Sequence, residues 1–241
     1  YFEQFTQIKT MLEPRDFYDN KFYINQQKRS EKVPFIVNET VIEKSLTEIL
    51  GKPVDMIKTP MGANSKIFYS QKSDDVYREM MENSDNFLAE HLLILASSTM
   101  NGKLSSTQVI NYAKKSFLKD LKQQPEWFDG SGLSRYNLFT PQSFVQVLEK
   151  MYNEFPEQRL QAIFPVGGKT GTIKNRYKDS ATPYIFAKTG TLNNNVTLSG
   201  YIKTKSGQTL IFSLMNNNST KSLSLIRNEN EKLLRLVRDN F

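Results

Sequence analysis

A Lys-Thr-Gly-Thr segment at residues 188–191 has the chemistry of an anion-binding strand end. The Lys188 ammonium supplies a fixed positive charge for a carboxylate, and Thr189 adds a hydroxyl donor. Gly190 leaves the backbone bare, so that an extended peptide can lie against the strand edge and bond to the main chain. The segment alone is not specific, because an ordinary strand-to-turn boundary uses the same residue types.

A second copy of the same four residues occupies positions 169–172 and follows Gly167 and Gly168. A phosphate-binding loop needs a glycine five residues before its second glycine, and here that position is Ile163. No strand pattern precedes the copy either. We therefore interpret it as a loop and not as a phosphate site.

Residues 84–86 (Ser-Asp-Asn) lie in a polar break between two helical patterns. The Ser84 hydroxyl can relay a proton, and the Asn86 amide presents a donor and an acceptor to a substrate amide. A helix N-cap favours the same residue types, so both interpretations stay open for this segment by itself.

Apolar spacing predicts the elements that must position these residues. Helical patterns cover residues 36–50, 74–83, 87–98, 107–122, 141–153 and 222–241. Strand patterns cover residues 184–188, 196–202 and 210–215, with a hairpin turn at 205–208. Helices followed by an antiparallel meander and a covering helix indicate an α+β fold, an antiparallel sheet covered by helices. Residues 1–35 are the least regular part and are interpreted as an extended arm or the remnant of a preceding domain.

Composition excludes several classes of site. The 241 residues contain no cysteine, which excludes disulfides, cysteine-bound zinc and thiol catalysis. The single histidine, His91, lies inside a helical pattern, so we expect neither a histidine-rich metal site nor a Ser-His-Asp triad. The longest apolar run, residues 92–96, is far shorter than the roughly 20 residues that span a bilayer.

The net charge of +7 suits an anionic partner such as nucleic acid, phospholipid or an acidic wall polymer. The positive charges are scattered and form no basic stripe beside a nucleic-acid motif, so we expect no nucleic-acid partner.

The order of the motifs resembles a known family. Ser-x-x-Lys, Ser-Asp-Asn and Lys-Thr-Gly are the signature of penicillin-binding proteins and related β-lactamases. Residues 83–90, 129–137 and 187–192 resemble the D-alanyl-D-alanine carboxypeptidases of the peptidase S13 type, the penicillin-binding protein 4 group. The segment Asp-Gly-Ser-Gly-Leu-Ser-Arg-Tyr-Asn at 129–137 is the most specific part. The resemblance runs from about residue 36 to the C-terminus and implies a penicillin-binding transpeptidase-like fold, incomplete in this chain.

The resemblance implies a serine-type carboxypeptidase or endopeptidase that acts on the D-Ala-D-Ala end of peptidoglycan stem peptides. Such an enzyme is acylated by β-lactams and needs no metal or organic cofactor. Its substrate lies outside the cytoplasmic membrane, so the resemblance implies a periplasmic or other envelope location.

Site roles follow from the same resemblance, position by position. Ser84 would relay a proton to the leaving D-alanine, and Asn86 would hold the substrate amide. Lys188 and Thr189 would anchor the terminal carboxylate, and the Thr191 backbone N–H would form half of an oxyanion hole. The remaining candidate contacts to the peptide stem are Gly190, Ser131 and Arg135.

The chain departs from the family pattern at the nucleophile. Its one Ser-x-x-Lys, residues 116–119, follows Ser84 instead of preceding it and sits in an ordinary helical pattern. The chain starts at Tyr1 and shows no signal-peptide pattern of a charged stretch followed by an apolar one. We therefore expect this chain to be the C-terminal portion of a longer protein, with the nucleophilic serine on the missing part.

An alternative from another class is a non-catalytic penicillin-fold module that binds cell-wall peptide or a protein partner. It would keep residues 129–137 and the strand edge without ever having had a nucleophile. A Ser-x-x-Lys motif ahead of Tyr1 would separate the enzyme from the module.

Overall fold

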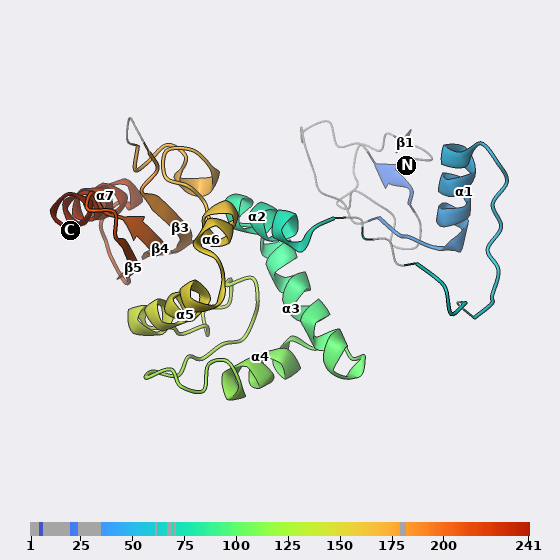
Figure 1. The fold of residues 1–241 in the computed structure, drawn as a ribbon, viewed down its shortest axis with the longest axis horizontal. Helices are drawn as coiled ribbons and strands as arrows, with labels where there is room; N and C mark the ends of the chain where they lie inside the picture. The colour runs from blue at the N-terminus through green and yellow to red at the C-terminus, as the bar shows by residue number, and fades with distance from the viewer. Residues whose placement is uncertain are drawn as a thin grey trace. The chain divides into compact units, whose positions relative to one another are not determined.

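The chain forms two compact units, Tyr1–Ile67 and Phe68–Phe241, in the computed structural model (Figure 1). The structure describes residues 5–6, 20–23, 35–60, 62–66, 69, 71–178 and 182–241. Most of the predicted arm at residues 1–35 lies outside these residues.

The described residues of the first unit form a short two-stranded sheet and one helix. Strand β1 (Phe5–Thr6) pairs in parallel with β2 (Phe22–Tyr23), and α1 spans Glu39–Leu50. Asn38 caps α1 by accepting a hydrogen bond from the Val41 N–H, so the helix starts three residues after the predicted position. None of the residues of α1 is buried.

In the described part of the second unit, four helices are followed by two short helical segments, three strands and a last helix. The helices are α2 (Ser73–Asn83), α3 (Asn86–Asn101), α4 (Ser106–Lys115), α5 (Pro141–Glu154), α6 (Glu157–Ile163) and the 3-10 turn η1 (Gly171–Ile173). The strands are β3 (Ile185–Leu192), β4 (Asn195–Lys203) and β5 (Thr209–Asn216), and α7 spans Leu223–Asn240. This confirms the predicted order of helices, antiparallel meander and covering helix.

The three strands form one antiparallel sheet in the order β3-β4-β5. Lys188 pairs with Ser199 across the first hairpin, whose tight turn places Asn194 at φ 63°. Gly207, at φ 89°, closes the second hairpin in the predicted turn. Because β3 is an edge strand, its outer side is open to other segments.

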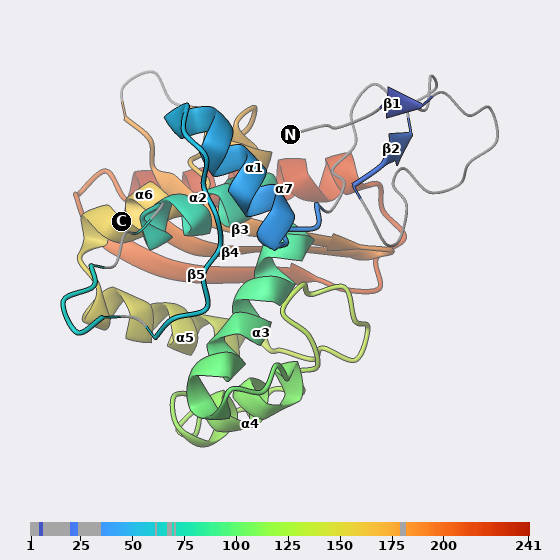
Figure 2. The same ribbon diagram turned by 90° about the vertical axis from the view of Figure 1, so that its right-hand side faces the viewer.

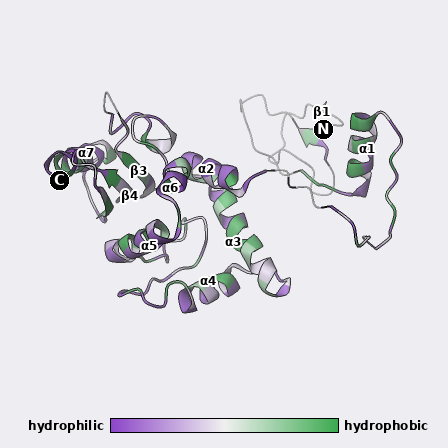
Figure 3. Cartoon of the chain, in the orientation of Figure 1, coloured by the Kyte–Doolittle hydropathy of each residue, from purple (hydrophilic) through white to green (hydrophobic). Residues whose placement is uncertain are grey.

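Both faces of the sheet are covered, α7 lying on one and α5 on the other (Figures 1 and 2). The α7 face holds the larger buried cluster: Ile173, Tyr177, Tyr184, Ile185, Ala187, Leu198, Ile202 and Leu234. The α5 face holds Leu148, Leu160, Phe164, Phe186 and Tyr201. Alternate residues of β3 therefore enter opposite cores, as the period of two requires. Figure 3 shows hydrophobic stretches in β3 and β4, and both hydrophobic and hydrophilic residues along α7.

The predicted helix at 107–122 is wrong at its C-terminal end, because α4 stops at Lys115. The next residues form turns that bury Leu121, which is 5% exposed. The Gln124 side-chain amide donates to the carbonyls of Leu118, Lys119 and Leu121 and replaces the helical hydrogen bonds. Tertiary burial of one leucine therefore outweighs the helical propensity of the segment.

We expect Leu234→Ala to lower the free energy of unfolding by about 2–5 kcal/mol, because it leaves a cavity under the sheet. Leu234 is 2% exposed in α7, whereas Leu236 on the same helix is 62% exposed. Leu236→Ala is the matched control and should change stability by less than about 0.5 kcal/mol. Urea unfolding followed by circular dichroism measures both, and equal losses would contradict the assigned faces of α7.

Candidate active site

The corner between α2 and α3 is built by residues 84–86. Ser84 is the C-cap of α2 and adopts the left-handed conformation, with φ 52° and ψ 48°. Asp85 caps α3 by accepting a hydrogen bond from the Leu88 N–H. A non-glycine residue in the left-handed region costs about 1–2 kcal/mol, so the fold holds this serine in a strained position. Asp85 is therefore the N-cap of α3, whereas the residues expected to do chemistry are its neighbours Ser84 and Asn86.

The Lys188 ammonium reaches this corner from the sheet. Its Nζ donates to Ser84 Oγ at 2.6 Å and to the Thr189 carbonyl at 2.7 Å. Burial lowers the pKa of Lys188 to about 8. A lysine with this pKa exchanges its proton close to neutral pH, and its contact leaves the Ser84 hydroxyl hydrogen available to another acceptor. The pair can thus supply both a positive charge and a mobile proton.

The edge of β3 supplies the other groups. The first part of this edge is taken, because the Ala187 N–H donates to the Pro165 carbonyl and the Gly167 N–H to the Ile185 carbonyl. By the period of two, Thr189 and Thr191 direct their main-chain groups toward the same edge. A ligand in extended conformation can therefore continue the pairing beyond residue 187.

Gly190 has a reason to be glycine besides the open edge. A Cβ at this position would lie 2.5 Å from Thr197 Oγ1 on the neighbouring strand β4. The Thr197 side chain therefore lies over Gly190, and a larger residue at position 190 would have to displace it.

The loop at 129–137 is fixed by its own polar side chains. Asp129 accepts hydrogen bonds from the N–H groups of Gly132 and Ser134 and from the Asn137 side-chain amide. Burial alone would raise the pKa of Asp129, but these hydrogen bonds outweigh it and lower the pKa. Arg135 is exposed on this rigid loop.

Glu90 ties the loop to the helix that follows the corner. Its Oε2 accepts from the Gly130 N–H at 2.7 Å and from the Ser131 N–H at 3.1 Å. A Cβ on Gly130 would lie 2.7 Å from the Ala89 carbonyl oxygen, so the loop backbone is pressed onto α3. Glu90 lies four residues after Asn86, on the same face of α3, so Ser131 is held on the side of the helix that carries Asn86.

The structure brings Ser84 and Lys188 into contact, as the sequence predicts. Among the described residues, no hydrogen bond joins Arg135 to any of the other candidate site residues, although its loop is anchored next to them. The catalytic roles themselves stay predictions.

Sequence reasoning missed three contacts. Glu90 holds the loop, Thr172 Oγ1 lies 2.8 Å from Thr189 Oγ1, and the Arg227 guanidinium donates to Thr191 Oγ1 at 3.2 Å. Spacing could have found Glu90, since a residue four positions after Asn86 shares its face. The second Lys-Thr-Gly-Thr copy was the signal for Thr172, and nothing in the sequence indicates Arg227.

Two other candidates lie on the surface. The Ser116 hydroxyl caps α4 by donating to the Tyr112 carbonyl, and His91 stacks on Phe87 with ring centroids 3.7 Å apart. His91 is exposed on α3, in the helical pattern where the sequence places it.

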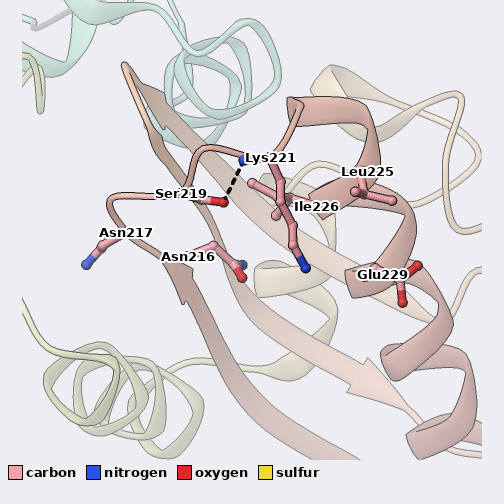
Figure 4. A pocket seen from close by; sticks show the side chains of 7 residues that line it. All are labelled: Asn216, Asn217, Ser219, Lys221, Leu225, Ile226 and Glu229. Carbon is pink, nitrogen blue, oxygen red and sulfur yellow. Dashed lines mark hydrogen bonds between the residues drawn. The ribbon is translucent and has the colours of Figure 1, made fainter.

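A hollow of about 310 Å³ lies between the end of β5 and the first turns of α7 (Figure 4). Asn216, Lys221 and Glu229 are among the residues that line it, and neither Ser84 nor Lys188 is. Within the described part of the chain, no helix is long and apolar enough to cross a membrane. No cluster of potential metal-binding side chains occurs among the same residues.

Comparison with known sequences relates nearly all of the second unit to one family. The family model described as D-Ala-D-Ala carboxypeptidase 3 (S13) matches residues 57–237. The chain is 28% identical over 226 residues to the D-alanyl-D-alanine carboxypeptidase DacB of Haemophilus influenzae, covering 86% of this chain and 47% of that protein. It is 39% identical over 95 residues to a D-alanyl-D-alanine carboxypeptidase of Actinomadura sp., covering 37% of this chain and 18% of that protein.

Comparison with solved structures agrees. Penicillin binding protein 4 (dacB) from Haemophilus influenzae, complexed with a novel β-lactam, superposes with a TM-score of 0.62 at 25% identity. The match covers 83% of this chain and 50% of that structure. The penicillin-binding fold expected from the sequence is therefore confirmed. The chain spans less than half the length of the two relatives above.

We expect the Lys188 ammonium to lose its proton at about pH 8, because its burial favours the neutral amine. Nuclear magnetic resonance of 13Cε-labelled lysine measures this directly, with the resonance assigned by its loss in Lys188→Met. A Lys188 resonance that stays unchanged up to pH 10 would contradict the burial of this side chain.

Proposed function

The chain belongs to the D-Ala-D-Ala carboxypeptidase 3 (S13) family, and we propose that its gene product is a serine-type D-Ala-D-Ala carboxypeptidase or endopeptidase. Its substrates are peptidoglycan stem peptides, and β-lactams acylate it. The observation that carries this proposal is the 2.6 Å contact between Lys188 Nζ and Ser84 Oγ, beside an open strand edge. That arrangement places a cation and a hydroxyl beside the open main-chain groups of a strand edge. These are the groups that bind the carboxylate and the backbone of a peptide C-terminus.

The nucleophile lies outside this chain in our proposal. The one Ser-x-x-Lys within it is a poor candidate, because the Ser116 hydroxyl is bonded to a helix carbonyl on an exposed surface. The family's serine, with a lysine three residues later, precedes the Ser-x-Asn motif. The match covers only 47% and 18% of these two relatives, which leaves room for that segment.

The reaction proceeds by acyl transfer. The serine oxygen attacks the carbonyl carbon of the penultimate D-alanine, and its proton passes to the neighbouring lysine. The peptide bond then breaks, and Ser84 passes a proton to the nitrogen of the departing D-alanine and regains one from that lysine. Water hydrolyses the resulting ester and regenerates the serine. A β-lactam follows the first step and stops at the ester, because its amine stays attached.

Binding groups come from this chain. The terminal carboxylate of the peptide lies at Lys188 and Thr189, and the Thr191 N–H donates to the oxygen that becomes negative in the tetrahedral intermediate. Asn86 hydrogen-bonds to the peptide amide. Arg135, exposed on the loop that Glu90 anchors, is suited to a carboxylate of the stem peptide.

The substrate sets the location. Peptidoglycan lies outside the cytoplasmic membrane, so the gene product acts in the cell envelope. No metal or organic cofactor takes part in this scheme.

We expect the complete gene product to react with a fluorescent penicillin and to carry the label on a serine outside residues 1–241. Mass spectrometry of the digested adduct locates that serine, and the 241-residue chain alone should stay unlabelled. Ser116→Ala should leave the labelling unchanged. An adduct on Ser116, or loss of labelling in Ser116→Ala, would show that the nucleophile lies in this chain.

We expect Ser84→Ala to slow the acylation of the complete gene product by about 10²–10⁴-fold, because a positioned proton relay contributes that much. Stopped-flow measurement with the same penicillin gives the rate. Ser98→Ala is the matched control, since the one hydrogen bond of the Ser98 hydroxyl to a described residue stays within α3, to the Leu95 carbonyl. Equal rates for Ser84→Ala and Ser98→Ala would remove Ser84 from the mechanism.

A further inference from the structure

The second Lys-Thr-Gly-Thr copy has no part in the function proposed above, yet its last residue touches the first copy. Thr172 Oγ1 lies 2.8 Å from Thr189 Oγ1, and either oxygen can donate. Thr172 is exposed at this contact, on the outer side of the strand edge. The two hydroxyls therefore meet where a ligand would pair with β3.

The segment that carries Thr172 is built rigidly. Thr170 Oγ1 accepts a hydrogen bond from the Val166 N–H and closes the turn before η1. Ile173, which is 1% exposed, anchors η1 in the core on the α7 face of the sheet. Thr172 is therefore exposed but held in place, because the turn before it and Ile173 after it are both fixed.

The same segment leans on the helix that ends at Ser84. Gly171 adopts φ +61°, and a Cβ there would lie 3.1 Å from both Cα and the carbonyl oxygen of Glu82. Glu82 lies two residues before Ser84. The position of Thr172 is therefore set by α2 and by the core together, at the point where α2, η1 and β3 meet.

We propose that Thr172 is a positioning residue, which orients the Thr189 hydroxyl toward the carboxylate of the ligand. The Thr189 hydroxyl has one hydrogen, so when it donates that hydrogen to a carboxylate, its 2.8 Å contact with Thr172 must be a bond that its oxygen accepts. Thr172 supplies that bond by donating to Thr189 Oγ1. Donation in series from Thr172 to Thr189 to the carboxylate polarises each bond and strengthens the last one. This inference rests on the carboxylate-binding role proposed for Thr189.

The test compares two ligands in the complete gene product: penicillin G, whose carboxylate is free, and its methyl ester, which has no charged carboxylate. Thr172→Val keeps the shape of the side chain and removes the hydroxyl. We expect it to lower the second-order acylation rate constant for penicillin G about 3–10-fold, the worth of one hydrogen bond, and to leave the rate for the ester unchanged. Thr172→Ser retains the hydroxyl and should restore the rate for penicillin G.

A double variant separates orientation from packing. Thr189→Val removes the hydroxyl that Thr172 is proposed to orient, so Thr172→Val should have no further effect in a Thr189→Val background. Equal losses for penicillin G and its ester, or additive losses in the double variant, would mean that Thr172 has only a structural role. If the wild-type protein reacts with penicillin G and Thr172→Val reacts at the same rate, the inference about Thr172 is overturned while the proposed function stands. A wild-type protein that does not react would overturn the proposed function as well.

Discussion

The hydrogen bond from the Lys188 ammonium to Ser84 Oγ joins two residues that lie 104 positions apart in the chain. A buried ammonium is costly unless it is satisfied by polar partners, and here the Ser84 hydroxyl and the Thr189 carbonyl are those partners. The sheet and the α2–α3 corner must therefore be held in register for the cation to be tolerated. The same burial lowers the pKa of Lys188.

Everything around the pair serves to hold its two sides in place. On the sheet side, β3 lies between two hydrophobic cores, so its backbone has little freedom. On the helix side, Ser84 lies in the left-handed region between α2 and α3, and Glu90 holds the loop at 129–137 against α3. Fixed polar groups of this kind need no rearrangement when charge develops on a ligand. The strain at Ser84 is consistent with a position selected for its chemistry.

Local patterns in the sequence were sufficient for the order and type of the main elements, because the apolar periodicity of α5, α7 and the three strands reflects the cores they enter. They were insufficient where tertiary contacts decide the local structure. The end of α4 depends on the burial of Leu121, and the short helix η1 depends on packing of Gly171 against α2. At the site, motif order indicated Ser84 and Lys188. The contributions of Glu90, Thr172 and Arg227 come from distant segments whose pairing no local pattern encodes.

A crystal structure of the complete gene product acylated by penicillin G would test the account most directly. The account predicts that the penicillin carboxylate lies within hydrogen-bond distance, about 2.5–3.0 Å, of Thr189 Oγ1, with Lys188 Nζ still on Ser84. A carboxylate directed to solvent, or an adduct remote from the edge of β3 with Ser84 and Lys188 apart, would contradict it.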